Sequence, residues 1–208
     1  MLRIKHNSPM FVFKLLVKLS MYINNDSNDE RFYLMETVEV ESLIKCELDG
    51  HSITIRPISI QDMTLESDFI EHLSAETKHY RFFGAINNVP EKVLKAFCDV
   101  DGKSSMAFIA TEQLNGEEIE IGVCRYVVTG NPDIHEMAVT IADEWQYKGL
   151  GKLLMNQLIG YAKSHGVKSI YSVELADNAL MHMLSKDLGM QAKIDPNDIH
   201  QVIYSLTL

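Results

Sequence analysis

The chain has 208 residues, a formal net charge of −10 at pH 7, 46% hydrophobic residues and 23% charged residues. This composition excludes a fibrous or wholly disordered chain, and the length accommodates one core domain with an appendage. Because nucleic-acid binding requires clustered Lys and Arg, the acidic balance argues against a nucleic-acid partner and suits cationic partners, such as lysine-bearing proteins or polyamines.

The first fifty residues differ from the rest of the chain. Residues 10–23 are apolar but are interrupted by Lys14 and Lys18, whereas a membrane span needs about 20 continuous apolar residues. This pattern predicts an amphipathic helix that docks on its own domain, or else contacts a membrane or a partner. Residues 24–30 are polar and indicate a linker. We therefore divide the chain into a leader, residues 1–50, and a folded domain, residues 51–208.

The folded domain alternates between strand and helix patterns. Residues 52–58 alternate apolar and polar side chains, which predicts a strand, and three helices are expected at 59–73, 77–83 and 90–97. Three strands follow at 106–111, 119–128 and 137–142, then a helix at 149–165, a strand at 169–175, a helix at 178–188 and a strand at 199–206. This order predicts an α/β domain whose mixed central sheet is flanked by helices on both faces.

The three cysteines, Cys46, Cys98 and Cys124, are scattered along the chain. No pair has the spacing of a zinc or redox motif, so neither a metal site nor a disulfide framework is expected. Cys98 and Cys124 stand in apolar runs and are interpreted as core residues. A reducing, cytoplasmic compartment fits this pattern.

The segment from Glu136 to Lys152 carries the chemistry. A strand leads into a loop with Gly149 and Gly151, and a helix begins directly after it. The unpaired N–H groups of a helix N-terminus form an anion site, and Lys148 and Lys152 add positive charge. Leu153 and Leu154 stand where a Walker loop and a dinucleotide fingerprint need other residues, so both are excluded. Two glycines before a helix are also compatible with a plain turn.

Three features in order resemble the acetyl-CoA site of GNAT acetyltransferases: Gln146-x-x-Gly149-x-Gly151, then Asn178, then Leu188-Gly-Met190. The resemblance implies a GNAT fold in which loop amides hold the pyrophosphate of acetyl-CoA and the preceding strand pairs with its pantetheine arm. Asn178 would contact the cofactor, serve as a helix N-cap, or do both. The implied cofactor-binding residues are Val139, Thr140, Ile141, Gln146, Tyr147, Lys148, Gly149, Leu150, Gly151, Lys152 and Asn178.

The likeness extends to about residues 51–191. Ile55-Arg-Pro-Ile58 with Asp62, Tyr80-Arg-Phe-Phe83 and the segment 97–101 resemble bacterial protein lysine acetyltransferases that modify acyl-CoA synthetases. This implies a protein lysine as the acceptor. A small amine, such as a polyamine or an amino acid, is an alternative acceptor. A non-catalytic acyl-CoA-binding module is an alternative of another class.

Amine acetylation needs a base, because a lysine amine has a reference pKa of about 10.4. Glu136 shares a strand face with Ala138 and Thr140, which leaves room for a substrate, and the family's base commonly lies at this distance before the loop. We therefore expect Glu136 to be the general base rather than an exposed strand carboxylate. A backbone N–H of the same strand is the expected oxyanion donor. His135 is expected to be a solvated residue at the strand end.

The family pattern breaks at the general acid. Ser185 stands where many GNAT enzymes carry a tyrosine that protonates the leaving thiolate. Serine is a much weaker acid, and nothing in the sequence directs the nearby His182 at the site. The general acid is therefore left unassigned.

Overall fold

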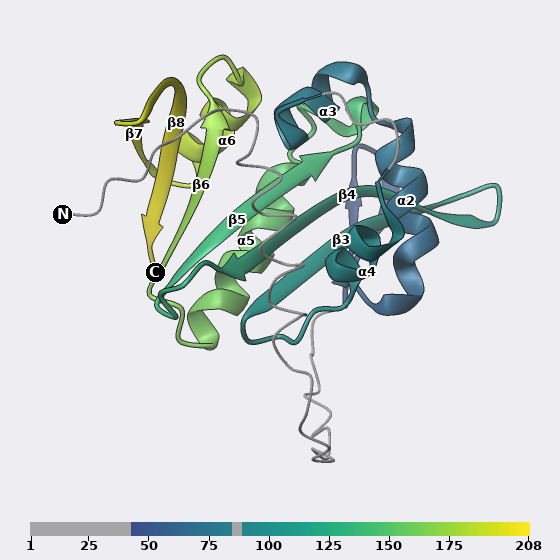
Figure 1. Ribbon diagram of the computed structural model, residues 1–208. Helices are drawn as coiled ribbons and strands as arrows, with labels where there is room; N and C mark the ends of the chain where they lie inside the picture. The colour runs from purple at the N-terminus through teal and green to yellow at the C-terminus, as the bar shows by residue number, and fades with distance from the viewer. Residues whose placement is uncertain (1–42, 85–88) are drawn as a thin grey trace, which may run out of the picture.

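A computed structural model describes residues 43–84 and 89–208. Its centre is an eight-stranded sheet in the order β1-β2-β3-β4-β5-β6-β8-β7 (Figure 1). The strands are β1 (Ile44–Leu48), β2 (His51–Pro57), β3 (Ser105–Leu114), β4 (Glu117–Val128), β5 (Ile134–Ile141), β6 (Ser169–Leu175), β7 (Gln191–Asp195) and β8 (Asp198–Thr207). All neighbours are antiparallel except β5 and β6, which are parallel. The predicted mixed sheet is confirmed.

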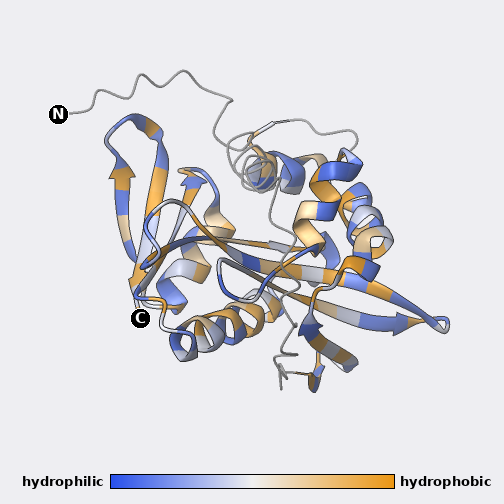
Figure 2. Ribbon diagram, turned by 60° about the horizontal axis from the view of Figure 1, so that its bottom comes forward, coloured by the Kyte–Doolittle hydropathy of each residue, from blue (hydrophilic) through white to orange (hydrophobic). Residues whose placement is uncertain are grey.

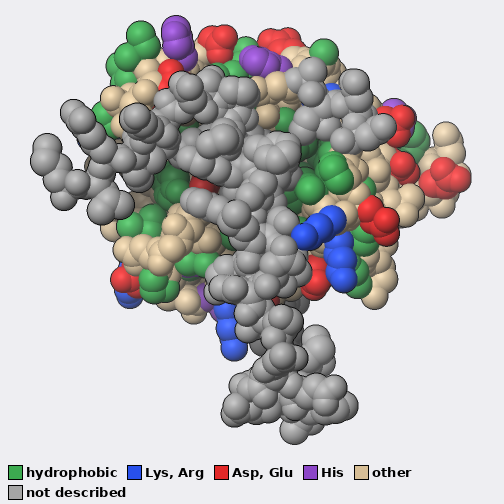
Figure 3. Space-filling view, viewed as in Figure 1, with side chains coloured by type: hydrophobic (Ala, Val, Ile, Leu, Met, Phe, Trp, Pro, Cys, Tyr) green, Lys and Arg blue, Asp and Glu red, His purple; other side chains and the backbone are tan. Residues whose placement is uncertain are grey.

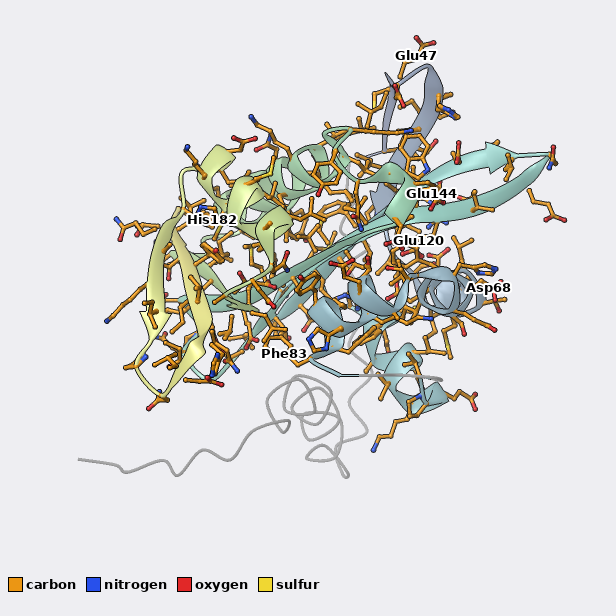
Figure 4. All side chains as sticks on the ribbon, turned by 90° about the horizontal axis from the view of Figure 1, so that it is seen from above. Glu47, Asp68, Phe83, Glu120, Glu144 and His182 are labelled. Carbon is orange, nitrogen blue, oxygen red and sulfur yellow. The ribbon has the colours of Figure 1, made fainter. Side chains whose placement is uncertain are left out.

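Helices cover both faces of this sheet (Figure 4). One face carries α2 (Met63–His72), α3 (Ala75–Phe82) and α4 (Glu91–Cys98), and the other carries α5 (Leu150–Ser164) and α6 (Ala179–Asp187). Short 3-10 turns, Ile60–Asp62 and Asp143–Trp145, precede α2 and α5. In Figure 4, Asp68 and Phe83 lie on the first side and His182 on the second.

Helix α5 packs on β3, β4 and β5 through an apolar stripe, which Figure 2 shows turned toward the sheet. Leu150, Leu154 and Leu158 are fully buried in this stripe, and each such side chain stabilises the fold by about 1.5 to 3 kcal/mol. A Cβ on Gly122 of β4 would lie 3.1 Å from Cδ1 of Leu154. The glycine therefore allows the helix to approach the strand closely.

The opposite face buries charged side chains. Arg125 of β4 donates to Oε1 of Glu66 on α2 at 2.6 Å, and its guanidinium lies 4.2 Å from the ring centre of Phe97. The β3–β4 register shifts between Ala110 and Thr111. This bulge changes the side-chain alternation, so Glu120 turns toward α2 (Figure 4). Burial and the neighbouring Glu66 raise the pKa of Glu120 well above its ordinary value.

The sheet extends upstream of the expected domain start at residue 51. Strand β1 pairs with β2, and its alternating Ile44, Cys46 and Leu48 pack against the core. Strand β7 was also not among the expected elements, because its side chains are mostly exposed and follow no apolar alternation. The expected leader helix at 10–23 and linker at 24–30 lie outside the described residues. Within the described part of the chain, no helix is long and apolar enough to cross a membrane.

Candidate active site

Strands β5 and β6 pair over only three residues and then diverge (Figure 1). The last pair joins Glu136 to Tyr171, although β5 continues to Ile141 and β6 to Leu175. A cavity of about 290 Å³ opens beyond this point, lined by both strands, α3, α6 and the first turn of α5. Beyond Glu136, β5 has lost its parallel partner, so its edge is suited to an extended ligand that adds main-chain hydrogen bonds.

The loop before α5 is held in place by its own side chains. Gln146 Nε2 donates to Thr77 Oγ1 at 3.1 Å and to the carbonyl oxygen of Ile141 at 3.3 Å. Gly149 is the helix N-cap with a φ of 92°, a left-handed conformation that favours glycine. The exposed Tyr147 also has a positive φ, of 62°. The loop therefore presents the N-terminal amides of α5 at the mouth of the cavity, where an anion is stabilised.

Asp143 anchors the same loop to α3. Its carboxylate accepts hydrogen bonds from the backbone N–H of Ser74 at 2.8 Å and from the Thr77 hydroxyl at 2.7 Å. Burial opposes the charge, but these hydrogen bonds hold the pKa of Asp143 below its ordinary value. The carboxylate therefore stays ionised and keeps α3 beside the loop.

Ten of the eleven expected cofactor-binding residues line this cavity. Lys152 is among them and supplies a positive charge. Lys148 is the exception, because its ammonium group pairs with Asp49 at 2.7 Å and lies 5.0 Å from the ring centre of Trp145. The residues that line the cavity are Val139, Thr140, Ile141, Gln146, Tyr147, Gly149, Leu150, Gly151, Lys152 and Asn178.

The cavity walls suit a ligand with an anionic end and an aliphatic arm. Met137, Val173 and Met181 give it apolar sides. A Cβ on Gly151 would lie 3.5 Å from Cδ2 of Leu184 and 3.6 Å from Cγ1 of Ile141, so a larger side chain would fill the space between α5 and α6. Among the described residues, no cluster of His, Cys, Asp and Glu could hold a metal ion.

Glu136 lies where the two strands part, and its carboxylate lines the cavity. The hydroxyl of Tyr171 donates to Glu136 Oε2 at 3.1 Å. Burial and the charge of Glu136 raise the pKa of Tyr171 to about 12, so this hydroxyl keeps its proton at neutral pH. A carboxylate held in this way can accept a proton from a substrate that enters beside Ala138.

Polar residues that the sequence analysis did not assign to the site also line the cavity, among them Tyr80, Arg81 and Glu174. Burial and the charge of Arg125 lower the pKa of Arg81 to about 10. Burial raises the pKa of Glu174 to about 7, although Arg81 opposes this rise. Glu174 lies near the carboxyl end of β6, which is parallel to β5. Ligand sites are common at the carboxyl ends of parallel strands, so this position could have marked Glu174 as a candidate site residue.

Asn178 is an N-cap of α6, because its Oδ1 accepts from the backbone N–H of Met181 at 3.0 Å. Its Nδ2 lies 3.4 Å from Glu174 Oε2, and its side chain lines the cavity. The expected cap is confirmed, and the side chain is also positioned to meet a ligand.

Two other expectations concern residues beside the site. Ser185 is buried and donates to the backbone oxygen of His182 at 2.9 Å, so its hydroxyl does not line the cavity. The expectation that His135 is solvated was wrong. It is buried, and its ring packs edge-on against Tyr126 with centroids 4.8 Å apart. Burial therefore lowers the pKa of His135.

A sheet that forks between two parallel strands, with a glycine-containing anion loop on one side and a carboxylate at the fork, is the arrangement that the sequence resemblance to acyl-CoA-dependent transferases implies. Residues 69–190 match the sequence profile described as the acetyltransferase (GNAT) family. The chain belongs to this family of enzymes, which use acetyl-CoA to acetylate amines.

Known proteins with similar sequences agree with this assignment. The chain is 37% identical to Acetyltransferase PA5475 of Pseudomonas aeruginosa over 89% of its own length and 100% of that protein. It is 29% identical to Acetyltransferase Pat of Mycolicibacterium smegmatis over 67% of its length, but it spans only 41% of that protein. The solved GNAT domain of S. lividans PAT superposes with a TM-score of 0.72 at 24% identity, covering 80% of this chain and 97% of that domain.

Proposed function

We propose that the chain transfers the acetyl group of acetyl-CoA to a lysine amine of a protein, with Glu136 as the general base. The observation that carries this proposal is that β5 and β6 part directly after Glu136 and Tyr171. The carboxylate therefore stands at the apex of the cavity, where a thioester threaded between the strands would meet an amine.

The ten lining residues named above would hold the cofactor. The first-turn amides of α5 and Lys152 would bind the pyrophosphate, and the free edge of β5 would pair with the pantetheine arm. A β5 backbone N–H would donate to the thioester oxygen as negative charge develops there. Glu136 would remove the proton of the attacking amine, directly or through water.

The resemblance to bacterial protein lysine acetyltransferases outside the cofactor loop favours a protein lysine over a small amine as the acceptor. Arg56 and Asp62, part of that likeness, form a two-pronged ion pair with distances of 2.9 and 2.7 Å. Tyr80 and Phe83, from another matching segment, line the cavity. Acidic side chains stand around the visible rim of the molecule (Figure 3), which suits a cationic acceptor. The free cysteines Cys46, Cys98 and Cys124 support a reducing, cytoplasmic location.

The base is tested by Glu136→Gln, with Glu117→Gln on the exposed β3–β4 hairpin as the matched control. The first variant should lose at least about a hundredfold in turnover at unchanged acetyl-CoA affinity, and the control should lose nothing. Unchanged turnover in Glu136→Gln would remove it as the base. If the wild-type chain binds acetyl-CoA without any transfer, the non-catalytic binding module is the correct interpretation.

The acceptor is tested by offering a purified acyl-CoA synthetase and a panel of polyamines and amino acids to the same enzyme. Acetylation of a lysine on the synthetase is expected. Acetylation of the small amines alone would refute the protein acceptor.

A further inference from the structure

Glu174 of β6 is a half-buried acid in the cavity that the base mechanism above does not use. Its strand has separated from β5 by this point, since the last β5–β6 pair is Glu136 with Tyr171. On its other side Glu174 pairs with Val202 of β8. The carboxylate lines the cavity, and Oε2 lies 3.4 Å from the side-chain amide of Asn178.

The two carboxylates of the cavity project from opposite faces of the forked sheet. Glu136 lies on the same face as its pair partner Tyr171, with which it is hydrogen-bonded. Glu174 lies three positions after Tyr171 along β6, so it points to the other face. That face carries α5 and α6, and therefore the loop that would hold the pyrophosphate. A thioester threaded through the fork would have its carbonyl carbon toward Glu136 and its sulfur toward Glu174.

The surroundings of Glu174 keep it partly protonated near neutral pH. Burial raises its pKa to about 7, Arg81 of α3 opposes the rise, and Glu136 of β5 adds to it. Burial and, to a smaller extent, the charge of Glu174 raise the pKa of Tyr204 on β8, and the Tyr204 hydroxyl contacts Nδ1 of His182 on α6 at 3.3 Å. A carboxylic acid with this pKa can donate a proton to a thiolate, whose reference pKa is about 8.5.

We propose that Glu174 is the general acid that protonates the leaving sulfur of CoA. This inference rests on the acetyltransferase function proposed above. The bond between the amine nitrogen and the acetyl carbon forms while the carbon–sulfur bond breaks. Glu136 takes the proton from the nitrogen, and the sulfur takes the proton of Glu174. The carboxylate of Glu174 then regains a proton from water, and Glu136 releases its proton to water. The products are the acetylated amine and the free thiol.

This assignment accounts for the serine found where many relatives have a tyrosine. The Ser185 hydroxyl is directed to the backbone oxygen of His182 and lies outside the cavity lining. Glu174 reaches the same side of the cavity from the strand instead of from α6. A proton donor is thus present without a tyrosine on the helix.

The test compares Glu174→Gln, Glu174→Asp and the exposed control Glu117→Gln in the full chain. Acetyl-CoA affinity is measured by calorimetry, and kcat is measured from pH 6 to pH 9. We expect Glu174→Gln to lower kcat about 10- to 100-fold at unchanged affinity, Glu174→Asp to recover part of the loss, and the control to match the wild type. In the wild type, the rise of kcat with pH should level off above about pH 7 as Glu174 loses its proton. In Glu174→Gln the rise should continue.

A Glu174→Gln enzyme with wild-type kcat and pH profile would overturn the inference, and so would a loss confined to acetyl-CoA affinity. These outcomes are distinct from a failure of the proposed function. If the proposed function is wrong, the wild type itself transfers no acetyl group, or Glu136→Gln keeps full turnover.

Discussion

The hydroxyl of Tyr171 donates a hydrogen bond of 3.1 Å to Glu136 Oε2, across the last residue pair that joins β5 to β6. The hydroxyl also contacts Thr129 Oγ1 at 3.1 Å. Since both residues are fixed by strand pairing, the carboxylate is held in one orientation at the entrance of the fork. The pairing of β5 with β6 therefore sets the orientation of the carboxylate that we propose as the general base.

Replacing Tyr171 by Phe should therefore impair catalysis without affecting cofactor binding. Loss of one hydrogen bond of about 1 to 1.5 kcal/mol corresponds to a decrease in kcat of about 5- to 10-fold. Thr129→Val is the matched control, because it removes the other contact of the hydroxyl and leaves the bond to Glu136. Equal effects of the two variants on kcat would show that the Tyr171–Glu136 bond does not orient the base.

Gly149 should tolerate a side chain poorly for reasons of backbone conformation. Its φ of 92° disfavours any residue with a Cβ, although no atom lies within 4 Å of the position that a Cβ would take. We expect Gly149→Ala to destabilise the fold by about 1 to 2 kcal/mol and to weaken acetyl-CoA binding, because the loop must change shape to relieve the strain.

Gly160, which lies within α5, provides the comparison. It also has open space around its Cβ position but no positive φ. Gly160→Ala should be neutral or stabilise the fold by about 0.5 to 1 kcal/mol. Thermal unfolding and acetyl-CoA titration of both variants check the pair, and equal stability of the two would contradict the strain assigned to Gly149.

The buried ion pair between Arg125 and Glu66 should matter for stability. Glu66 is 1% exposed and lies beside Glu120, so Arg125→Met would leave a buried carboxylate without its cation. Breaking such a pair costs about 3 to 5 kcal/mol. Adding Glu66→Gln to the same chain should recover part of this loss in chemical denaturation. No recovery would mean that Arg125 acts through its packing on Phe97.

The pKa of Glu174 also predicts how stability depends on pH. Its value of about 7 in the folded chain exceeds the ordinary 4.5, so the folded state holds a proton that the unfolded state releases between these two values. Stability therefore falls as the pH rises through that window. Glu174→Gln removes this dependence. It should leave stability at pH 4 unchanged and raise it at pH 8 by about 1 to 3 kcal/mol. A stability difference of the same size at both pH values would contradict the assigned pKa.

Two shortened chains test where the domain begins. A chain that starts at Met35 keeps β1 and the Asp49–Lys148 ion pair, and we propose that it remains folded and active. A chain that starts at Ser52 lacks both, exposes the edge of β2, and should unfold at a lower temperature. Equal melting temperatures would show that β1 adds nothing to the sheet.

The sequence predicted the central elements well because their patterns are strong. The alternation in 52–58 and the apolar stripe of α5 each correspond to an observed element. The edge strands β1 and β7 were missed, since an edge strand needs to bury only one side and carries a weaker pattern. Ten of the eleven predicted cofactor residues share one cavity because a contiguous loop and strand supply nearly all of them.

The remaining site features depend on contacts distant in sequence. Arg81 of α3, Glu136 of β5 and Glu174 of β6 line one cavity because the sheet forks, and no local sequence pattern predicts that fork. The burial of His135 depends likewise on Tyr126 of the neighbouring strand. The pKa of Glu174 follows from burial and from two charges on other elements, so residue type and spacing could not have predicted it.

The most direct test of the central claim is a calorimetric titration of the purified chain with acetyl-CoA, alongside Gly151→Phe. The account predicts saturable binding of one acetyl-CoA per chain by the wild type. It predicts loss of binding in the variant, whose ring would occupy the space between Ile141 and Leu184. Undiminished binding by a folded Gly151→Phe chain, or no binding by the wild type, would contradict a cofactor site between β5 and β6.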